Sequence, residues 1–466
     1  MEAADELLMV ALGVALLLLF LCIFWPTSQR ALGNTIKVRD PAIARDMLIN
    51  QAAAFSNRPS TPFPVALITG RRRRSRSHGI TTVPYGPHWR ALRCNLTAAV
   101  LQPWRLGRLA PLQHEATDAL LAALRSPGHT GDAVVVIRDS LYTAVFALLT
   151  RVCFGGGIDT GHVHAMQRMM QEFRVAIGEA RAFAGSPLAR LLHRRRWRRF
   201  LAFRDQQAAL FLPLIHARWR RSSCGGIRPY VDSLIDLRVP DDNAGGGGRA
   251  LTDDEMVSLV VEFLGATESI VACVEWTLAH LVTQPEVQRK LRQEVTGADD
   301  PGDGDERLGR MPYLHAVVLE CLRLHPPFPL ILRDVHAEGA AGSGTTAPAG
   351  GTKVYFVLKD IARDRKAWTD PDEFRPERFV AGGEGQGVGP LPGSKEMRMM
   401  PFGAGHRSCP GAGLGMLYVK RFLAVLLREF EWAPPAEGCA GVDMAELFGF
   451  IAVMKTPLTA RITPVT

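Results

Sequence analysis

The pattern of hydrophobic and polar positions along the chain predicts a mainly helical protein. Apolar residues recur at the three- to four-residue spacing of an amphipathic helix in several segments. These segments are 108–125, 163–182, 197–220, 252–284, 285–296, 312–325 and 411–430. Strand-like runs are few and short, namely Thr35–Val38, Val134–Ile137 and Lys353–Leu358. Loops rich in glycine and small polar residues are expected at 240–250, 296–305, 337–352 and 381–394. The pattern therefore predicts a mainly α fold with minor β structure.

The N-terminus carries one uninterrupted apolar run, Leu7–Trp25, which contains no charged residue. Its length is close to the roughly 20 residues that a helix needs to cross a hydrocarbon core. Acidic residues precede the run and basic residues follow it, so the rest of the chain is expected on the cytoplasmic side. A cleaved signal peptide is the alternative, but the acidic start and the lack of a small-residue cleavage site disfavour it. The sequence thus predicts a membrane anchor over 1–26 and one further domain over 27–466.

The apolar segment 252–284 is predicted to form a long helix through the core. It begins with a capping box, Thr252 to Glu255, and Pro285 marks its far end. Its middle nevertheless carries an acid and an alcohol, Glu268 and Ser269, beside small residues. A buried carboxylate without a partner is costly, so Glu268 is expected to have either a partner or a function.

Composition and charge restrict the setting without identifying the function. The chain has 466 residues, 47% of them hydrophobic, which is enough for a large core. Its 8 cysteines are scattered singly, as is usual in a reducing compartment. The net charge of +9 suits nucleic acid, an anionic membrane or an acidic partner. Arginine runs at 71–76 and 194–199, the second containing Trp197, allow a nucleic-acid interpretation, but no nucleic-acid fold signature accompanies them. A solvated loop or a face toward anionic lipid is favoured, and no nucleic-acid partner is expected.

Three motifs follow one another in the C-terminal half. The predicted helix 312–325 places Glu320 and Arg323 on one face, because they are three residues apart. Arg378 follows in the stretch DPDEFRPERF, and PFGAGHRSCPG then spans 401–411 around Cys409. No second cysteine lies near Cys409, and neither C-x-x-C pairs nor the C…H spacing of a structural zinc site appears around it, so a disulfide or structural zinc site is not indicated.

Together these motifs closely resemble the cytochrome P450 family of haem–thiolate monooxygenases, from about Pro41 to the C-terminus. The family's pattern F-x-x-G-x-R-x-C-x-G is matched at five positions, Phe402, Gly405, Arg407, Cys409 and Gly411. The resemblance implies the cytochrome P450 fold, with haem b as cofactor and the Cys409 thiolate as axial ligand of its iron, which favours cleavage of the O–O bond. It also implies that the glycines allow a tight turn and let backbone amides point at the sulfur.

Further residues are expected to contact the haem through the same resemblance. Trp89 and Arg93, in YGPHWRALR, resemble the W-x-x-x-R of the helix in which both side chains reach a haem propionate. Arg407 is expected to donate to the other propionate, and Arg333 occupies the position of a further basic propionate ligand. Glu320, Arg323 and Arg378 are expected to form the family's buried acid–arginine triad.

The long helix departs from the family pattern A-G-x-D/E-T at the oxygen-activating turn. Here the turn reads Gly265-Ala266-Thr267-Glu268-Ser269, so the acid–alcohol pair is kept with serine in place of threonine. Glu268 and Ser269 are expected to relay protons as the catalytic pair. The alternative is that Ser269 is a tolerated core alcohol bonded to its own helix.

The resemblance predicts a monooxygenase that inserts one oxygen atom into a hydrophobic small molecule, most like plant microsomal members. Its electrons are expected from NADPH–cytochrome P450 reductase, and its place is the endoplasmic reticulum membrane, as a single-pass protein with a cytoplasmic catalytic domain. Lys420 and Arg421 could face this acidic redox partner. The N-terminal β-region looks shortened, with Thr35–Val38 as its remaining strand. Alternatives are a haem-binding but inactive member and a membrane-tethered basic module without haem. The substrate cannot be read from the sequence.

Overall fold

The computed structural model describes residues 35–59, 79–125, 133–180, 183, 187–220, 228–240, 247–297, 305–335, 351–393, 396–435, 441–449 and 451–465. The predicted anchor at 7–25 and the arginine run 71–76 lie outside the described residues. Within them, the helix Asp253–Thr283 is the one that is long and apolar enough to cross a membrane, and 67% of its most apolar window is buried inside the protein. This helix therefore serves as the core helix of the fold.

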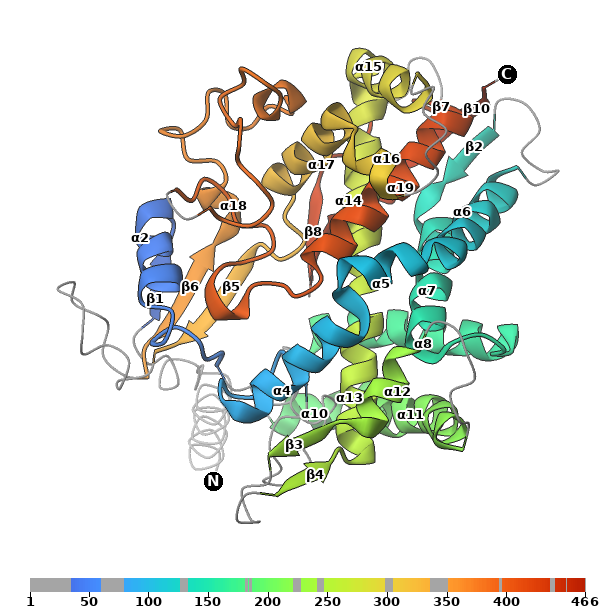
Figure 1. Cartoon of the computed structure of the whole chain (residues 1–466), viewed down its shortest axis with the longest axis vertical. Helices are drawn as coiled ribbons and strands as arrows, with labels where there is room; N and C mark the ends of the chain where they lie inside the picture. The colour runs from blue at the N-terminus through green and yellow to red at the C-terminus, as the bar shows by residue number, and fades with distance from the viewer. Residues whose placement is uncertain are drawn as a thin grey trace, which may run out of the picture.

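The core helix is built from two consecutive elements, α13 (Asp253–Leu264) and α14 (Ala266–Thr283), which meet at Gly265. The predicted capping box is present, because the Thr252 hydroxyl accepts from the Glu255 amide and the Glu255 carboxylate accepts from the Thr252 amide. In Figure 1 this helix runs vertically through the centre of the molecule. Three long helices lie against α14: α7 (Ile137–Phe154), α17 (Pro312–Leu324) and α19 (Ala412–Glu429).

The remaining helices surround this centre. Around the core helix lie α4 (Pro87–Leu96), α5 (Pro103–Arg108), α6 (Ala110–Leu124), α8 (Thr160–Glu179), α10 (Pro187–Leu192), α11 (Arg194–Trp219) and α12 (Tyr230–Asp236), with α4 on its left and α6 and α8 on its right in Figure 1. Others are α2 (Pro41–Arg45), α15 (Pro285–Thr296), α16 (Asp305–Gly309) and α18 (Leu358–Ile361). Short π- and 3₁₀-helical turns occur at η2 (Asp46–Asn50), η3 (Thr97–Leu101), η6 (Pro376–Phe379) and η7 (Gly405–Arg407).

The β structure consists of small sheets at the periphery. One sheet has the order β1 (Thr35–Val38), β6 (Lys353–Val357), β5 (Leu330–Asp334), with β1 parallel to β6 in the register Thr35 to Lys353. A second has the order β2 (Ala133–Val136), β10 (Thr459–Pro464), β7 (Phe430–Ala433). Two hairpins pair β3 (Arg238–Pro240) with β4 (Gly248–Ala250) and β8 (Glu446–Phe448) with β9 (Ala452–Met454). A mainly α fold with minor β structure is thus confirmed.

Amphipathic segments were predicted better than fully buried ones. The helix at 285–296 and the strand Thr35–Val38 have their predicted bounds. The stretch predicted as one loop over 240–250 contains strand β4 and the last residue of its partner β3 among its described residues. Helix α7 was not predicted, because apolar residues cover most of its surface and leave little helical periodicity in the sequence.

Candidate active site

The segment around Cys409 is a tight loop that leads into α19. Gly403 and Gly405 adopt φ angles of 73° and 69°, in the left-handed region that favours glycine. A side chain at Gly405 would also collide with the Leu48 carbonyl oxygen. The Cys409 amide donates to the Phe402 carbonyl over 2.7 Å and closes the loop. The glycines and Phe402 therefore fix the direction of the cysteine, as the motif predicted.

The Cys409 thiol is accessible to solvent, yet the surrounding protein desolvates it and raises its pKa. A side chain with both properties is recessed beneath the outer surface rather than displayed on it. Three neighbours act in the opposite direction and favour the thiolate: the Gly411 amide, which donates to the sulfur, and the charges of Arg93 and Arg58.

Four arginines from separate parts of the chain form a cluster beside the loop, and two of them, Arg58 and Arg93, act directly on the thiol. Arg93 comes from α4, Arg333 from β5, Arg407 from η7, and Arg58 from the segment that follows η2. Burial and mutual repulsion lower their pKa values: Arg58 and Arg407 both act on Arg333, and Arg58 also acts on Arg407, whose pKa falls to about 10. Such a concentration of like charge is costly unless anions balance it.

Several of the predicted haem-contacting donors already bond to the main chain. Arg407 donates to the carbonyls of Ser56, Ile80 and Val83 over 2.8, 2.9 and 2.5 Å. Arg93 donates to the Ser408 carbonyl over 2.6 Å. The Trp89 indole uses its single N–H on the Ile80 carbonyl, at 3.1 Å, so in this arrangement it has no donor left for a propionate. The arginines keep further N–H groups, because each guanidinium has five.

This donor set fits haem. One recessed thiol with an amide hydrogen bond suits an iron ligand, and the cluster of guanidinium groups that begins beside it with Arg58 and Arg93 suits two propionates. Ala266 adds a further indication, since it is exposed in the middle of an otherwise buried helix. A small side chain at this point lets a ligand approach the helix backbone.

The predicted acid–alcohol pair does not project to one side of α14. Glu268 forms an ion pair of 3.0 Å with Arg174 of α8 and accepts a hydrogen bond from Tyr142 of α7. Burial raises its pKa, against the effect of Arg174 and Tyr142. All three side chains line a small cavity between α7, α8 and α14. Ser269 is half-buried and lies about 100° further round the helix, on the side of Ala266 three residues before it.

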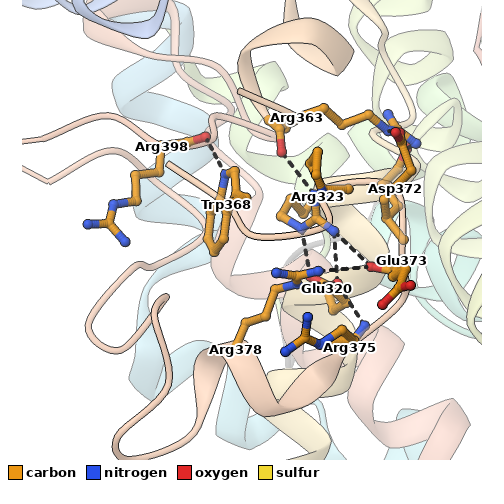
Figure 2. A network of polar contacts seen from close by, with 12 residues as sticks. Glu320, Arg323, Arg363, Trp368, Asp372, Glu373, Arg375, Arg378 and Arg398 are labelled. Atoms are coloured by element: carbon orange, nitrogen blue, oxygen red, sulfur yellow. Dashed lines mark hydrogen bonds and ion pairs between the residues drawn. The ribbon is translucent and has the colours of Figure 1, made fainter. Parts of the chain in front are cut away.

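The predicted acid–arginine triad is confirmed and fully buried. Arg323 Nε and Nη2 donate to the two oxygens of Glu320 over 2.7 and 2.8 Å, and Arg378 Nε donates to Glu320 over 3.2 Å. Figure 2 shows both arginines directed at this one carboxylate. The Arg375 amide also donates to it, over 2.8 Å. The triad joins α17 to the segment that carries η6.

The structure places two residues that the sequence left open as possible contacts with a partner, Arg421 and Trp197, inside the protein or against its own side chains. Arg421 is buried in α19, with only 6% of its surface exposed, so the prediction that it faces a redox partner is wrong. The physical reason is that α19 is a core helix covered by α6, α15 and α17. Trp197, in the second arginine run, packs against Phe183 and Phe200 at centroid distances of 5.5 and 5.7 Å.

Some residues of the site were not predicted from the sequence. Arg58 and Glu262 lie at the arginine cluster, and Arg174 and Tyr142 bind Glu268. The dipeptide Arg58-Pro59 matches no motif that would indicate a binding role for Arg58. Glu262 follows Glu255 by two helical turns, so its spacing alone did not distinguish it from a surface acid.

The comparisons with known proteins agree on one family. The Cytochrome P450 family model matches residues 32–459. The chain is 35% identical to Cytochrome P450 89A9 of Arabidopsis thaliana, over 92% of this chain and 84% of that protein. It is 31% identical to Cytochrome P450 98A1 of Sorghum bicolor (93% and 83% covered) and 30% identical to Germacrene A hydroxylase of Barnadesia spinosa (91% and 82%).

Solved structures show the same fold. A zebra fish cytochrome P450 with progesterone aligns with a TM-score of 0.73 and 22% identity, over 92% of this chain and 93% of that one. A zebra fish cytochrome P450 with abiraterone aligns with a TM-score of 0.71 and 22% identity, over 93% and 94%. The chain therefore belongs to the cytochrome P450 family, most similar to plant members, and is a haem-dependent monooxygenase.

Proposed function

We propose that the Cys409 thiolate binds the haem iron and that Arg58, Arg93, Arg333 and Arg407 hold the haem propionates. The observation that supports this assignment is a cluster of four arginines from separate elements, two of which, Arg58 and Arg93, act on the recessed thiol. When bound, haem supplies the redox chemistry that activates dioxygen for insertion into a C–H bond. The Gly411 amide, by donating to the sulfur, moderates how strongly the thiolate donates to iron.

We propose that proton delivery is divided between Glu268 and Ser269. Glu268 takes up a proton at its carboxylate, because burial raises its pKa, and Tyr142 and Arg174 hold the carboxylate in the cavity. Ser269 passes a proton from its hydroxyl on the side of Ala266. The two are neighbours in sequence but face different ways, so a short rotation of the Glu268 side chain or an ordered water connects them.

The substrate we infer is a hydrophobic small molecule. The side of α14 near Ala266 is apolar apart from the serine, and pockets of this kind are lined mainly by apolar groups. Electrons are supplied by NADPH–cytochrome P450 reductase. The apolar run 7–25 anchors the protein as a single span in the endoplasmic reticulum membrane, with the catalytic domain in the cytoplasm.

Oxygen incorporation tests the proposed function. The full chain is co-expressed with NADPH–cytochrome P450 reductase in microsomes and supplied with ¹⁸O₂ and a panel of apolar terpenes and aromatics. We expect NADPH-dependent products that carry one ¹⁸O atom, and no product from Cys409→Ser in microsomes with equal protein content. Labelled product from Cys409→Ser would overturn the assignment of the thiolate.

The ratio of product formed to oxygen consumed tests the proton route. Ser269→Ala is expected to divert oxygen to peroxide by several-fold while leaving the haem spectrum intact. Ser269→Thr is expected to improve the ratio, because the added methyl restricts the side-chain rotamer. Glu268→Gln should slow turnover, since an amide does not carry the proton. An equal ratio in all three variants would mean that protons arrive by another route.

A further inference from the structure

Glu262, in the last turn of α13, binds the segment 79–83. The Thr81 amide donates to its carboxylate over 3.1 Å, and the Thr81 hydroxyl and the Ile80 amide donate to it as well. Gly79 lies so close that a side chain there would collide with this carboxylate. The segment is therefore fastened to the core helix through its N–H groups.

The carbonyl groups of the same segment accept from the arginine cluster. Ile80 O accepts from Arg407 Nη1 and Trp89 Nε1, and Val83 O accepts from Arg407 Nη2. Thr81 O accepts from Arg58 Nη1 over 3.4 Å. One short segment thus lies between a carboxylate on one side and cationic donors on the other. Because hydrogen bonds in series polarise one another, each side supports the geometry of the other.

The charge of Glu262 also reaches the cluster directly. It acts on Arg58 and on Arg407, where it opposes the effect of burial on both guanidinium groups. The four arginines carry four positive charges, which a thiolate and two propionates would balance only in part. Burial raises the pKa of Glu262, but the Thr81 and Ile80 donors and the charge of Arg58 favour its ionised form, which supplies one more negative charge. This balance of charges depends on the haem placement proposed above.

We propose that Glu262 is a positioning residue that holds the segment 79–83 against the arginine cluster and keeps the haem reduction potential low. A fixed negative charge near the haem favours the oxidised iron, which carries one more positive charge than the reduced iron. Its removal therefore favours reduction by one electron. The same removal loosens the segment to which Arg407, Arg58 and Trp89 are bonded.

The reduction potential of the purified holoprotein tests the charge. Glu262→Gln keeps an oxygen acceptor for Thr81 but removes the charge. We expect a shift to more positive potential, on the order of tenfold in the one-electron reduction equilibrium, which corresponds to about 59 mV. Asp254→Asn is the matched control, because Asp254 lies in the same helix with 60% of its side chain exposed. This control should keep the wild-type potential.

Two further variants separate the charge from the hydrogen bonds. Arg58→Gln should shift the potential the opposite way, and the double variant Glu262→Gln/Arg58→Gln should return it toward the wild-type value. Thr81→Val keeps the charge but removes the hydroxyl donor, so its potential should stay near the wild type while haem transfers faster to an excess of apomyoglobin.

The result that overturns the proposal is a wild-type potential and a wild-type rate of haem loss in Glu262→Gln with the thiolate spectrum intact. If Glu262→Gln does not accumulate as holoprotein, the Arg58→Gln variant replaces it in the test. A reduction potential of Arg58→Gln equal to that of the wild type would then overturn the proposal. Failure of the haem placement itself is distinguishable, because the wild-type protein would then lack the thiolate spectrum.

Discussion

The Glu320 network and the arginine cluster near Cys409 both desolvate guanidinium groups, but only the network pairs them with a buried carboxylate at their centre. All five N–H groups of Arg323 have acceptors: two bonds go to Glu320 and the others to the carbonyls of Ala362, Pro371 and Glu373. Figure 2 shows Arg323 between the Glu320 carboxylate and Glu373, with Arg378 directed at the same carboxylate. In the cluster, by contrast, arginines repel one another and lower each other's pKa. A completed network stabilises the fold, whereas an excess of one charge prepares a site for an anionic ligand.

The largest effect is expected from breaking the completed network. Arg323→Ala leaves Glu320 buried without its bidentate partner, which costs about 3–5 kcal/mol. We expect little folded holoprotein, measured by haem content and thermal unfolding of the purified full chain. Arg398→Ala is the control from the rim of the same network, since Arg398 pairs with the exposed Glu396, and should cost less than about 1 kcal/mol. Equal stability of Arg323→Ala and the wild type would contradict the account.

Removing an arginine from the cluster near Cys409 is expected to change the free energy of unfolding less, but to lower haem affinity clearly. Arg333→Leu removes a buried charge that Arg58 and Arg407 repel, so the free energy of unfolding of the apoprotein should not fall by more than about 1 kcal/mol. Haem affinity should fall at least about tenfold if Arg333 holds a propionate as proposed, because the variant then loses a charged partner of that propionate. Competition with apomyoglobin measures this affinity. Unchanged affinity would place the propionates elsewhere.

Acid should weaken the network through Glu384. Burial raises the pKa of this carboxyl group, but the Thr369 amide and Arg378 outweigh burial and hold the pKa below the usual value of a glutamate. Its contribution, on the order of 1 kcal/mol, is then fully present above the unfolded pKa of about 4.3 and is lost as the pH falls through the lower folded value. Glu384→Gln should therefore be less stable than the wild type at pH 7, and the difference should vanish in acid. A pH-independent difference in urea unfolding would contradict this sign.

Sequence patterns predicted the parts of the molecule that have one buried face or one local motif. The helix 285–296 has an apolar stripe and a starting proline, and its bounds were predicted without error. Helix α7 is buried on most sides, so its sequence contains little periodicity to read. The triad was predicted because the E-x-x-R spacing places Glu320 and Arg323 on one helical face, and the family resemblance supplied Arg378.

The site is harder to predict because its residues meet only through the tertiary fold. Cys409 and Arg407 lie in one motif, but Arg58 joins them from some 350 residues away and has no motif of its own. Glu268 and Ser269 are adjacent in sequence, yet helical geometry turns them to different sides, which a linear motif does not show. The role of Glu262 depends on the segment 79–83, which contacts it only in the folded protein.

The absorption spectrum of the reduced, carbon-monoxide-treated protein tests the central claim most directly. If Cys409 is the iron ligand, the full-length wild-type protein shows the strongly red-shifted Soret band of a thiolate-bound haem, and Cys409→Ser loses this shift while the Glu320 network keeps the protein folded. A wild-type protein that binds haem without the shifted band, or a Cys409→Ser variant that retains it, would contradict the account.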